Sequence, residues 1–235
     1  GYKKEGTTSR TFADEMSYRL KDSSNSYLPK KLGTITYGVH LGQVYTDYDS
    51  GSFKVTDNAT DFAIDGKGFF AIAFTDKSGN TSVKYTRDGS FTVNTEGYLV
   101  TKDGDYVLNA TGAMNGDPDP RNRIQVDPNA TISVNKLGYI MQNDQIVGTL
   151  GMVDIDNYDY LEKYGENMYN LLDGGTRIAT DANVEQGVLE TSNVNVIKEM
   201  VNMITIQRAY EAGQKVITSI DSTLDRAVNN VGRVQ

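Results

Sequence analysis

The sequence predicts a mainly β protein with a long C-terminal α-helix. Residues 33–189 alternate short β-branched or aromatic runs with Gly, Asp and Asn turns, which is typical of short antiparallel strands. Residues 194–231 contain no Pro, and their apolar side chains recur at steps of three and four, which is typical of a helix. The 235 residues include 23 Gly and 15 Tyr, a composition that favours turns and sheet. We therefore expect a β-rich middle domain of short antiparallel strands and a coiled-coil-like terminal helix.

Residues 1–32 are predicted to form an N-terminal connector. They are polar, with Ser and Lys concentrated before a break at Pro29. A short helix is expected around Phe12 to Leu20. The chain begins at Gly1 without an initiator Met, so we expect it to be part of something longer.

The clearest strand pattern lies between Lys84 and Leu108. Three turn pairs, Asp88-Gly89, Glu96-Gly97 and Asp103-Gly104, fall seven or eight residues apart in it. A Gly after an acidic residue allows the positive φ of a tight hairpin turn. The three pairs therefore predict a meander of short antiparallel strands.

Part of this unit recurs 41 residues later. Residues 92–94 and 97–99 (Thr-Val-Asn and Gly-Tyr-Leu) match residues 133–135 and 138–140 (Ser-Val-Asn and Gly-Tyr-Ile). The match predicts two related hairpins. Chance similarity is the alternative, because few residue types are tolerated in hairpin turns.

Residues 190–235 are predicted to be an assembly helix. Its periodic part spans 38 residues, which at about 1.5 Å each gives a rod of roughly 57 Å. Ser192 or Asn193 is expected to cap its N-terminus. The apolar residues expected to form the assembly face are Val196, Met200, Met203, Ile204, Tyr210, Ile217, Ile220, Leu224 and Val228.

This helix needs a partner. The seven-residue spacing of Ile217, Leu224 and Val231 is that of a coiled-coil seam, although Gln214 and Asp221 interrupt it. An exposed apolar stripe of this length favours association, and no other segment of the chain is long enough to be an antiparallel mate. We therefore favour packing against another subunit or a missing segment over burial against the chain's own β domain.

The composition excludes several kinds of active site. Because the chain has no Cys and His40 is its single histidine, it cannot build a thiolate site or a multi-histidine metal site. The net charge of −8 argues against broad binding to nucleic acid, which requires clustered Lys and Arg. No run approaches the roughly 20 apolar residues that cross a bilayer.

Local patterns that suggest chemistry are incomplete. The stretch Gly66-Lys67-Gly68 lacks the rest of a phosphate loop, so we interpret it as a tight turn. Residues 154–159 begin like a calcium loop but lack its later Gly and Glu, so a surface acidic turn is expected. No nucleophile motif accompanies His40. We assign no catalytic, cofactor-binding or metal-ligating residue and expect no cofactor.

Six motifs are distributed over the whole chain. They are Gly1-Tyr2-Lys3-Lys4 and residues 60–70, 85–91, 165–169, 189–196 and 202–211. Together they resemble the motifs of the bacterial flagellar basal-body rod and hook protein family. The chain is similar to rod proteins more than to the hook, because it is short and has a single modest β domain.

The resemblance implies a non-enzymatic structural subunit of the flagellar basal-body rod. It also implies that residues 1–32 follow a helix that is missing from this chain and that pairs with the C-terminal helix in the family. Such a subunit self-assembles through terminal helices into a tube that transmits torque to the hook, and it lies outside the cytoplasm after export. The implied partners are copies of itself and other rod and hook proteins, with no nucleic acid, membrane insertion or small-molecule substrate. The resemblance leaves open whether the position is proximal or distal. The alternative is an extracellular β-rich binding module, either an adhesin or a carbohydrate binder.

Overall fold

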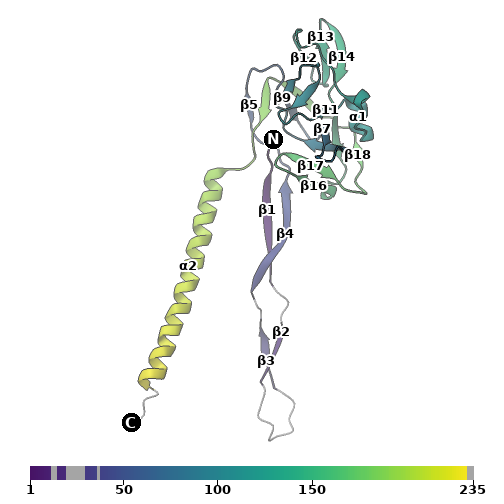
Figure 1. Ribbon diagram of the computed structural model, residues 1–235. Coiled ribbons are helices and arrows are strands. Elements are labelled where there is room, and N and C mark those ends of the chain that lie inside the picture. Colours follow the sequence, from purple (N-terminus) through teal and green to yellow (C-terminus); the bar gives the residue numbers. More distant parts are fainter. Residues whose placement is uncertain (12–14, 20–29, 36–37, 232–235) are drawn as a thin grey trace. The chain divides into compact units, whose positions relative to one another are not determined.

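The computed structural model describes residues 1–11, 15–19, 30–35 and 38–231. Two units are separated by their contacts, Gly1–Asn193 and Val194–Gln235. Figure 1 shows that the first unit contains the strands and the short helix α1 (Ala110–Asn115), whereas the second contains the long helix α2 (Val196–Arg226). The predicted fold class, mainly β with a long C-terminal helix, is confirmed.

The first strands form two antiparallel pairs. Strand β1 (Lys4–Thr11) pairs with β4 (Val39–Asp47), and Lys4 lies opposite Asp47. Strand β2 (Glu15–Arg19) pairs with β3 (Lys30–Ile35). The short helix predicted around Phe12 to Leu20 is therefore wrong over Glu15–Arg19, while the rest of that prediction lies outside the described residues. The sequence of β2 alternates polar and apolar residues with the period of a strand, and cross-strand pairing outweighs a weak local helix preference.

Strand β7 (Phe69–Thr75) lies at the centre of the largest sheet. It pairs antiparallel with β8 (Thr81–Thr86), β11 (Tyr106–Val107) and β15 (Met152–Ile155). The other strands of this sheet are β9 (Phe91–Val93), β10 (Leu99–Thr101), β16 (Leu161–Tyr164), β17 (Met168–Leu171) and β18 (Arg177–Ile178).

Smaller sheets surround this one. Strand β6 (Phe62–Asp65) pairs with β19 (Asn183–Gln186), and β5 (Phe53–Val55) pairs with β20 (Val188–Glu190). A three-stranded sheet consists of β12 (Ser133–Val134), β13 (Tyr139–Gln142) and β14 (Gln145–Thr149). Short 3-10 turns span Pro120–Asn122 and Tyr158–Tyr160.

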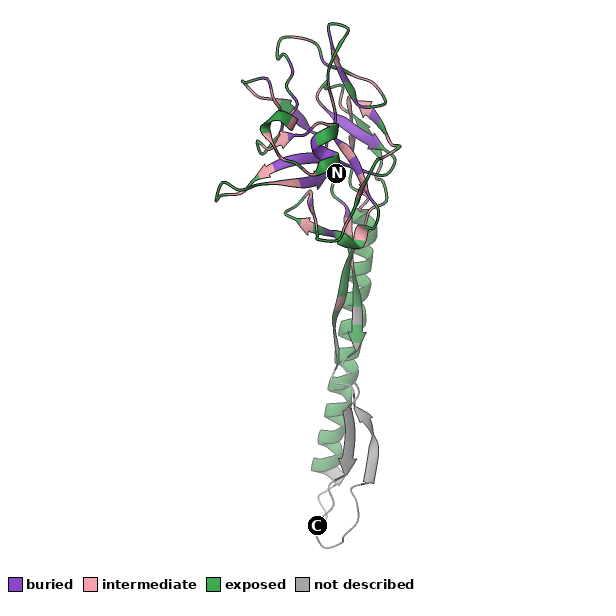
Figure 2. Ribbon diagram, turned by 90° about the vertical axis from the view of Figure 1, so that its right-hand side faces the viewer, coloured by how far each residue is buried: buried purple, intermediate pink, exposed green. Residues whose placement is uncertain are grey.

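The core of the domain lies on both faces of β7. Phe70 and Ile72 pack into one apolar cluster, whereas Phe69, Ala71 and Ala73 pack into the other. Successive side chains of a strand point to opposite faces, so a continuous apolar run fits a strand that is covered on both sides. Figure 2 shows this buried core in purple within the domain.

Two of the three predicted acidic-Gly hairpin turns are confirmed. Glu96-Gly97 connects the paired strands β9 and β10, and Asp103-Gly104 connects β10 and β11. The prediction at Asp88-Gly89 is wrong, because β8 does not pair with β9. A Cβ on Gly89 would lie 1.8 Å from the backbone carbonyl oxygen of Phe62. Gly89 is therefore required by its close approach to β6.

The 41-residue repeat corresponds to two hairpins with the same turn. Asn94 Oδ1 accepts hydrogen bonds from the backbone N–H groups of residues 96 and 98, and Asn135 Oδ1 accepts them from residues 137 and 139. Gly97 and Gly138 have φ values of 84° and 81°. The repeat interpretation therefore predicts the local structure correctly.

Helix α2 extends over 31 residues and is followed by a π-helical turn at Ala227–Val231. Its N-cap is Asn195, whose Oδ1 accepts a hydrogen bond from the backbone N–H of Lys198 at 3.0 Å. The predicted caps Ser192 and Asn193 are wrong. The side chain of Asn193 instead bonds to the backbone of Lys4 and of residues near the end of β4. No helix in the described ranges is long and apolar enough to cross a membrane.

Candidate functional site

The apolar face of α2 is unburied within the described chain. Helix α2 has no buried residue, and Figure 2 shows it almost entirely in green, the colour of exposed residues. The exposed fraction ranges from 50 to 71% for the nine residues predicted to form the assembly face, which are Val196, Met200, Met203, Ile204, Tyr210, Ile217, Ile220, Leu224 and Val228. Contiguous exposed apolar surface of this kind marks an interaction site.

This apolar face turns gradually around the helix. At about 100° per residue, Val196, Met200 and Met203 fall within roughly 60° of one another. Ile217 and Leu224 lie about 60° to 90° further round, in the direction in which a seven-residue spacing moves about 20° per heptad. A partner helix in a left-handed supercoil would follow this path.

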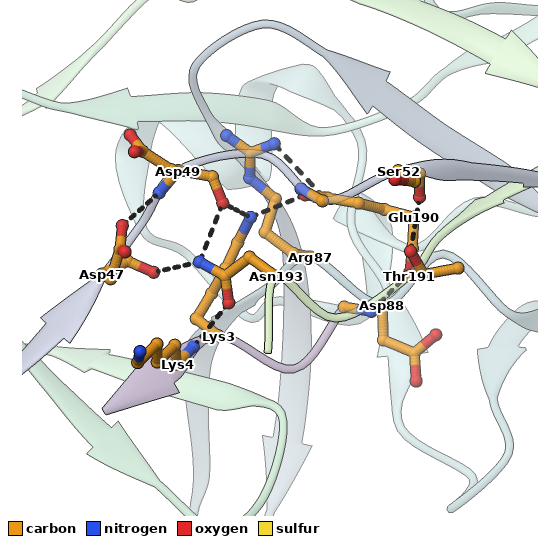
Figure 3. A network of polar contacts seen from close by, with 12 residues as sticks. Lys3, Lys4, Asp47, Asp49, Ser52, Arg87, Asp88, Glu190, Thr191 and Asn193 are labelled. Atoms are coloured by element: carbon orange, nitrogen blue, oxygen red, sulfur yellow. Dashed lines mark hydrogen bonds and ion pairs between the residues drawn. The ribbon is translucent and has the colours of Figure 1, made fainter. Parts of the chain in front are cut away.

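A buried ionic cluster joins Lys3, Arg87 and Glu190 (Figure 3). Glu190 Oε1 accepts a hydrogen bond from Lys3 Nζ at 2.6 Å, and Glu190 Oε2 lies 3.5 Å from Arg87 Nη1. The exposed fractions of the Glu190, Lys3 and Arg87 side chains are 0, 1 and 3%. One carboxylate therefore compensates two cations in a site without access to water.

Further contacts hold the two cations. Lys3 Nζ donates to the carbonyl oxygen of Asp49 at 2.9 Å, and Arg87 Nη2 donates to that of Gly66 at 2.8 Å. The Arg87 guanidinium lies 5.4 Å from the centre of the Phe69 ring. Burial lowers the pKa of Lys3, and the hydrogen bond to Glu190 opposes this shift.

Asn193 contacts the same region of the domain. We call the contacts of Lys3, Arg87, Glu190 and Asn193 together the ionic junction. Its Oδ1 accepts a hydrogen bond from Lys4 N at 2.7 Å, and its Nδ2 donates to the carbonyl oxygens of Asp47 at 2.9 Å and Asp49 at 3.2 Å. Thr191 Oγ1 donates to the carbonyl oxygen of Ser52 at 2.8 Å. Figure 3 shows that these side chains come from segments far apart in the sequence.

An aromatic cluster packs beside the ionic junction. The Tyr48 ring lies 5.9, 4.9 and 5.5 Å from the rings of Phe69, Tyr158 and Tyr169. Burial raises the pKa values of Tyr48 and Tyr169. The Tyr169 hydroxyl is buried and has no hydrogen-bond partner among the described residues. The segment after β4 is thus fixed to the domain by ring packing as well as by polar contacts.

Strand β1 is also attached through an ion pair. Lys163 Nζ lies 3.1 Å from Glu5 Oε1 and donates to the Tyr2 hydroxyl at 3.3 Å. These groups are partly exposed, so their contribution to stability is on the order of 1 kcal/mol or less.

The stretches that resemble parts of phosphate-binding, calcium-binding or catalytic motifs have structural explanations. Gly66 and Gly68 have φ values of 127° and 132°, as in a turn. Asp154, at the start of the calcium-loop-like stretch, accepts a hydrogen bond from the Tyr158 hydroxyl at 2.7 Å. His40 lies exposed in β4. Over the part of the chain that the structure describes, no group of three His, Asp or Glu side chains could hold a metal ion.

Comparisons with known proteins agree with this architecture. Residues 185–230 match the family model "Flagellar basal body rod FlgEFG protein C-terminal", and residues 63–142 match "Flagellar hook protein FlgE/F/G D1 domain". The chain is 35% identical over 193 residues to the flagellar basal-body rod protein FlgF of Caulobacter vibrioides, with 81% of this chain and 73% of the relative covered. The chain belongs to the flagellar basal-body rod protein family. The predicted family and its location in the flagellar basal body are thereby confirmed.

Other rod-family relatives show similar coverage. The chain is 36% identical over 207 residues to FlgG of Buchnera aphidicola subsp. Schizaphis graminum, with 82% of this chain and 75% of the relative covered. It is 32% identical over 203 residues to FlgG of Bacillus subtilis, with 83% and 74% covered. Nothing in these comparisons supports the adhesin alternative.

The ionic junction includes residues of both matched regions. Arg87 lies in the D1 match, and Glu190 and Asn193 lie in the C-terminal match. The motifs that contain these residues and Lys3 are visible in the sequence, but no pattern in it predicts that they meet. The available signal was the presence of a charged residue in each of three widely separated motifs of the rod family.

Proposed function

We propose that this chain builds the flagellar rod by self-assembly through the apolar face of α2 and that it has no enzymatic activity. The observation that supports the proposal is the exposure of the nine apolar side chains on a helix with no buried residue. Its partners are further copies of the chain and other rod and hook proteins. Nucleic acid, membrane insertion and a small-molecule substrate have no part in this function.

The energetics favour association. Burial of an apolar side chain contributes roughly 1.5–3 kcal/mol when the side chain passes from full exposure to full burial. Nine side chains that are already partly covered would together contribute on the order of 10 kcal/mol. Association costs about 4–15 kcal/mol in lost freedom, so one helix contact is marginal and repeated contacts in a tube are needed for a stable assembly.

Torque passes between helix and domain through the residues just before α2. Glu190 and Asn193 fix this part of the chain to the domain by buried and partly buried polar contacts. A subunit with this construction resists separation of the domain from the chain that leads into the assembly helix.

The test uses charged substitutions on the apolar face in the native, flagellated cell. Met203→Asp and Ile217→Asp should abolish rod assembly and swimming, because a carboxylate buried in a dry seam costs several kcal/mol. The control is Ser219→Asp, which lies about 160° around the helix from Ile217. All three variants should keep the melting temperature of the domain, since these side chains lie outside it. Normal swimming by the Met203 and Ile217 variants at wild-type protein levels would refute the proposal.

A further inference from the structure

Strands β1 and β4 form an antiparallel pair, which we call the β1–β4 hairpin although β2 and β3 lie between its strands in the sequence. The side chain of Asn193 bridges both of these strands at the base of the hairpin, where residues 4 and 47 lie opposite each other. Lys4 is the first residue of β1, Asp47 is the last residue of β4, and the two are opposite each other in the register. Asn193 accepts a hydrogen bond from the backbone N–H of Lys4 and donates to the backbone carbonyl of Asp47. One amide therefore holds both strands to the end of the first unit, Gly1–Asn193.

An amide is required for these contacts. The Oδ1 atom serves as an acceptor for Lys4, while Nδ2 serves as a donor to the carbonyls of Asp47 and Asp49. A carboxylate of the same shape keeps the acceptor but loses the donor, and it would face two carbonyl oxygens. A carboxylate is therefore a poor replacement for the Asn193 amide.

Glu190 adds a second set of contacts to the same two hairpin ends. Its Oε1 accepts hydrogen bonds from Lys3 Nζ at 2.6 Å and from the backbone N–H of Gly51 at 2.8 Å. The residues before β1 and after β4 are thus both bound to residues 190–193. Both strands of the hairpin are therefore held at its base by side chains of residues 190 and 193.

We propose that Asn193 is a positioning residue that locks the base of the β1–β4 hairpin to the point where the chain leaves the domain. The hairpin is then a rigid arm of the domain, and each subunit presents it to neighbouring subunits in one orientation. The proposal deepens the proposed function, on which its biological meaning rests, but its test measures isolated chains and does not require assembly.

The test measures the mobility of the hairpin by electron spin resonance. Because the chain has no Cys, spin labels can be attached at cysteines introduced for Gln43 in β4 and for Lys77 in the turn between β7 and β8, both exposed. We expect a narrow distance distribution in the otherwise wild-type chain. Asn193→Asp should broaden it at least about twofold while the domain stays folded, with a melting temperature lowered by no more than about 10 °C for the lost, partly buried hydrogen bonds.

The matched control is Asn183→Asp, which introduces the same charge at an exposed position of β19. It should leave the distance distribution unchanged. In case the Asp variant fails to fold, Asn193→Ala gives a second measurement, in which the Lys4 amide should exchange its hydrogen about tenfold faster. A wild-type distribution for Asn193→Asp, equal broadening in the control, unchanged exchange in Asn193→Ala, or broadening only with loss of the domain fold would each overturn the proposal. Failure of rod assembly alone would count against the proposed function and not against this inference.

Discussion

Replacement of Glu190 by Gln tests whether the buried ionic cluster is held together by charge balance. The substitution keeps the shape of the side chain and an oxygen that can accept from Gly51 and Lys3. It removes the one carboxylate that contacts both buried cations, Lys3 and Arg87. Removal of one partner of a buried ion pair costs about 3–5 kcal/mol, because the remaining charge is uncompensated.

The assay is thermal unfolding followed by the near-ultraviolet circular dichroism of the tyrosines. For a chain of this length, 1 kcal/mol lowers the melting temperature by about 2–4 °C, so Glu190→Gln should lower it by roughly 6–20 °C. Lys3→Met is the informative comparison, because it removes a charged hydrogen bond but leaves one cation beside one carboxylate. Its expected cost is smaller, about 1.5–3 kcal/mol.

An exposed ion pair provides the control. Arg121 pairs with Asp119 at 3.1 Å, and the Arg121 side chain is 90% exposed. Arg121→Ala should therefore leave the melting temperature nearly unchanged. The charge-balance argument is wrong if Glu190→Gln costs less than 1 kcal/mol, or if Lys3→Met destabilises the domain more than Glu190→Gln does.

Three further predictions concern single contacts. Gly89→Ala should unfold or strongly destabilise the domain in thermal melts, because its Cβ would overlap a backbone carbonyl of β6 at 1.8 Å; a melt like that of the wild type would contradict this. Tyr169→Phe should leave the free energy of unfolding unchanged or raise it, since the buried Tyr169 hydroxyl has no hydrogen-bond partner among the described residues. Tyr158→Phe should lower the free energy of unfolding by about 1 kcal/mol in denaturant titrations, because it loses the hydrogen bond to Asp154. The reverse order of stability would exclude this account. Hydrogen bonds from Arg121 lower the pKa of Asp119 to about 2, so Arg121→Ala should raise it toward 3.8 in an NMR titration, and no shift would refute the pairing. In the wild type this carboxylate favours the folded state above pH 3.8, and its contribution is lost as the pH falls from 3.8 toward 2.

The sequence by itself determined the elements whose causes are local. The long helix follows from apolar residues three and four positions apart, and α2 covers most of the predicted span. The hairpin turns at Asn94 and Asn135 depend on an Asn side chain and a Gly three residues later, all within five residues. Such features need no information from the rest of the chain.

The tertiary structure decided the features that depend on distant partners. Glu190 is separated from Lys3 by 187 positions and from Arg87 by 103, and no local pattern indicates that these charges are buried together. Asn193 is of a residue type that often caps helices, but its side-chain amide binds the base of the β1–β4 hairpin. The residue that caps α2 is therefore Asn195. A buried charge or amide is stable only where the folded chain supplies its counter-charge or hydrogen-bond partners, and long-range contacts alone determine where those partners lie.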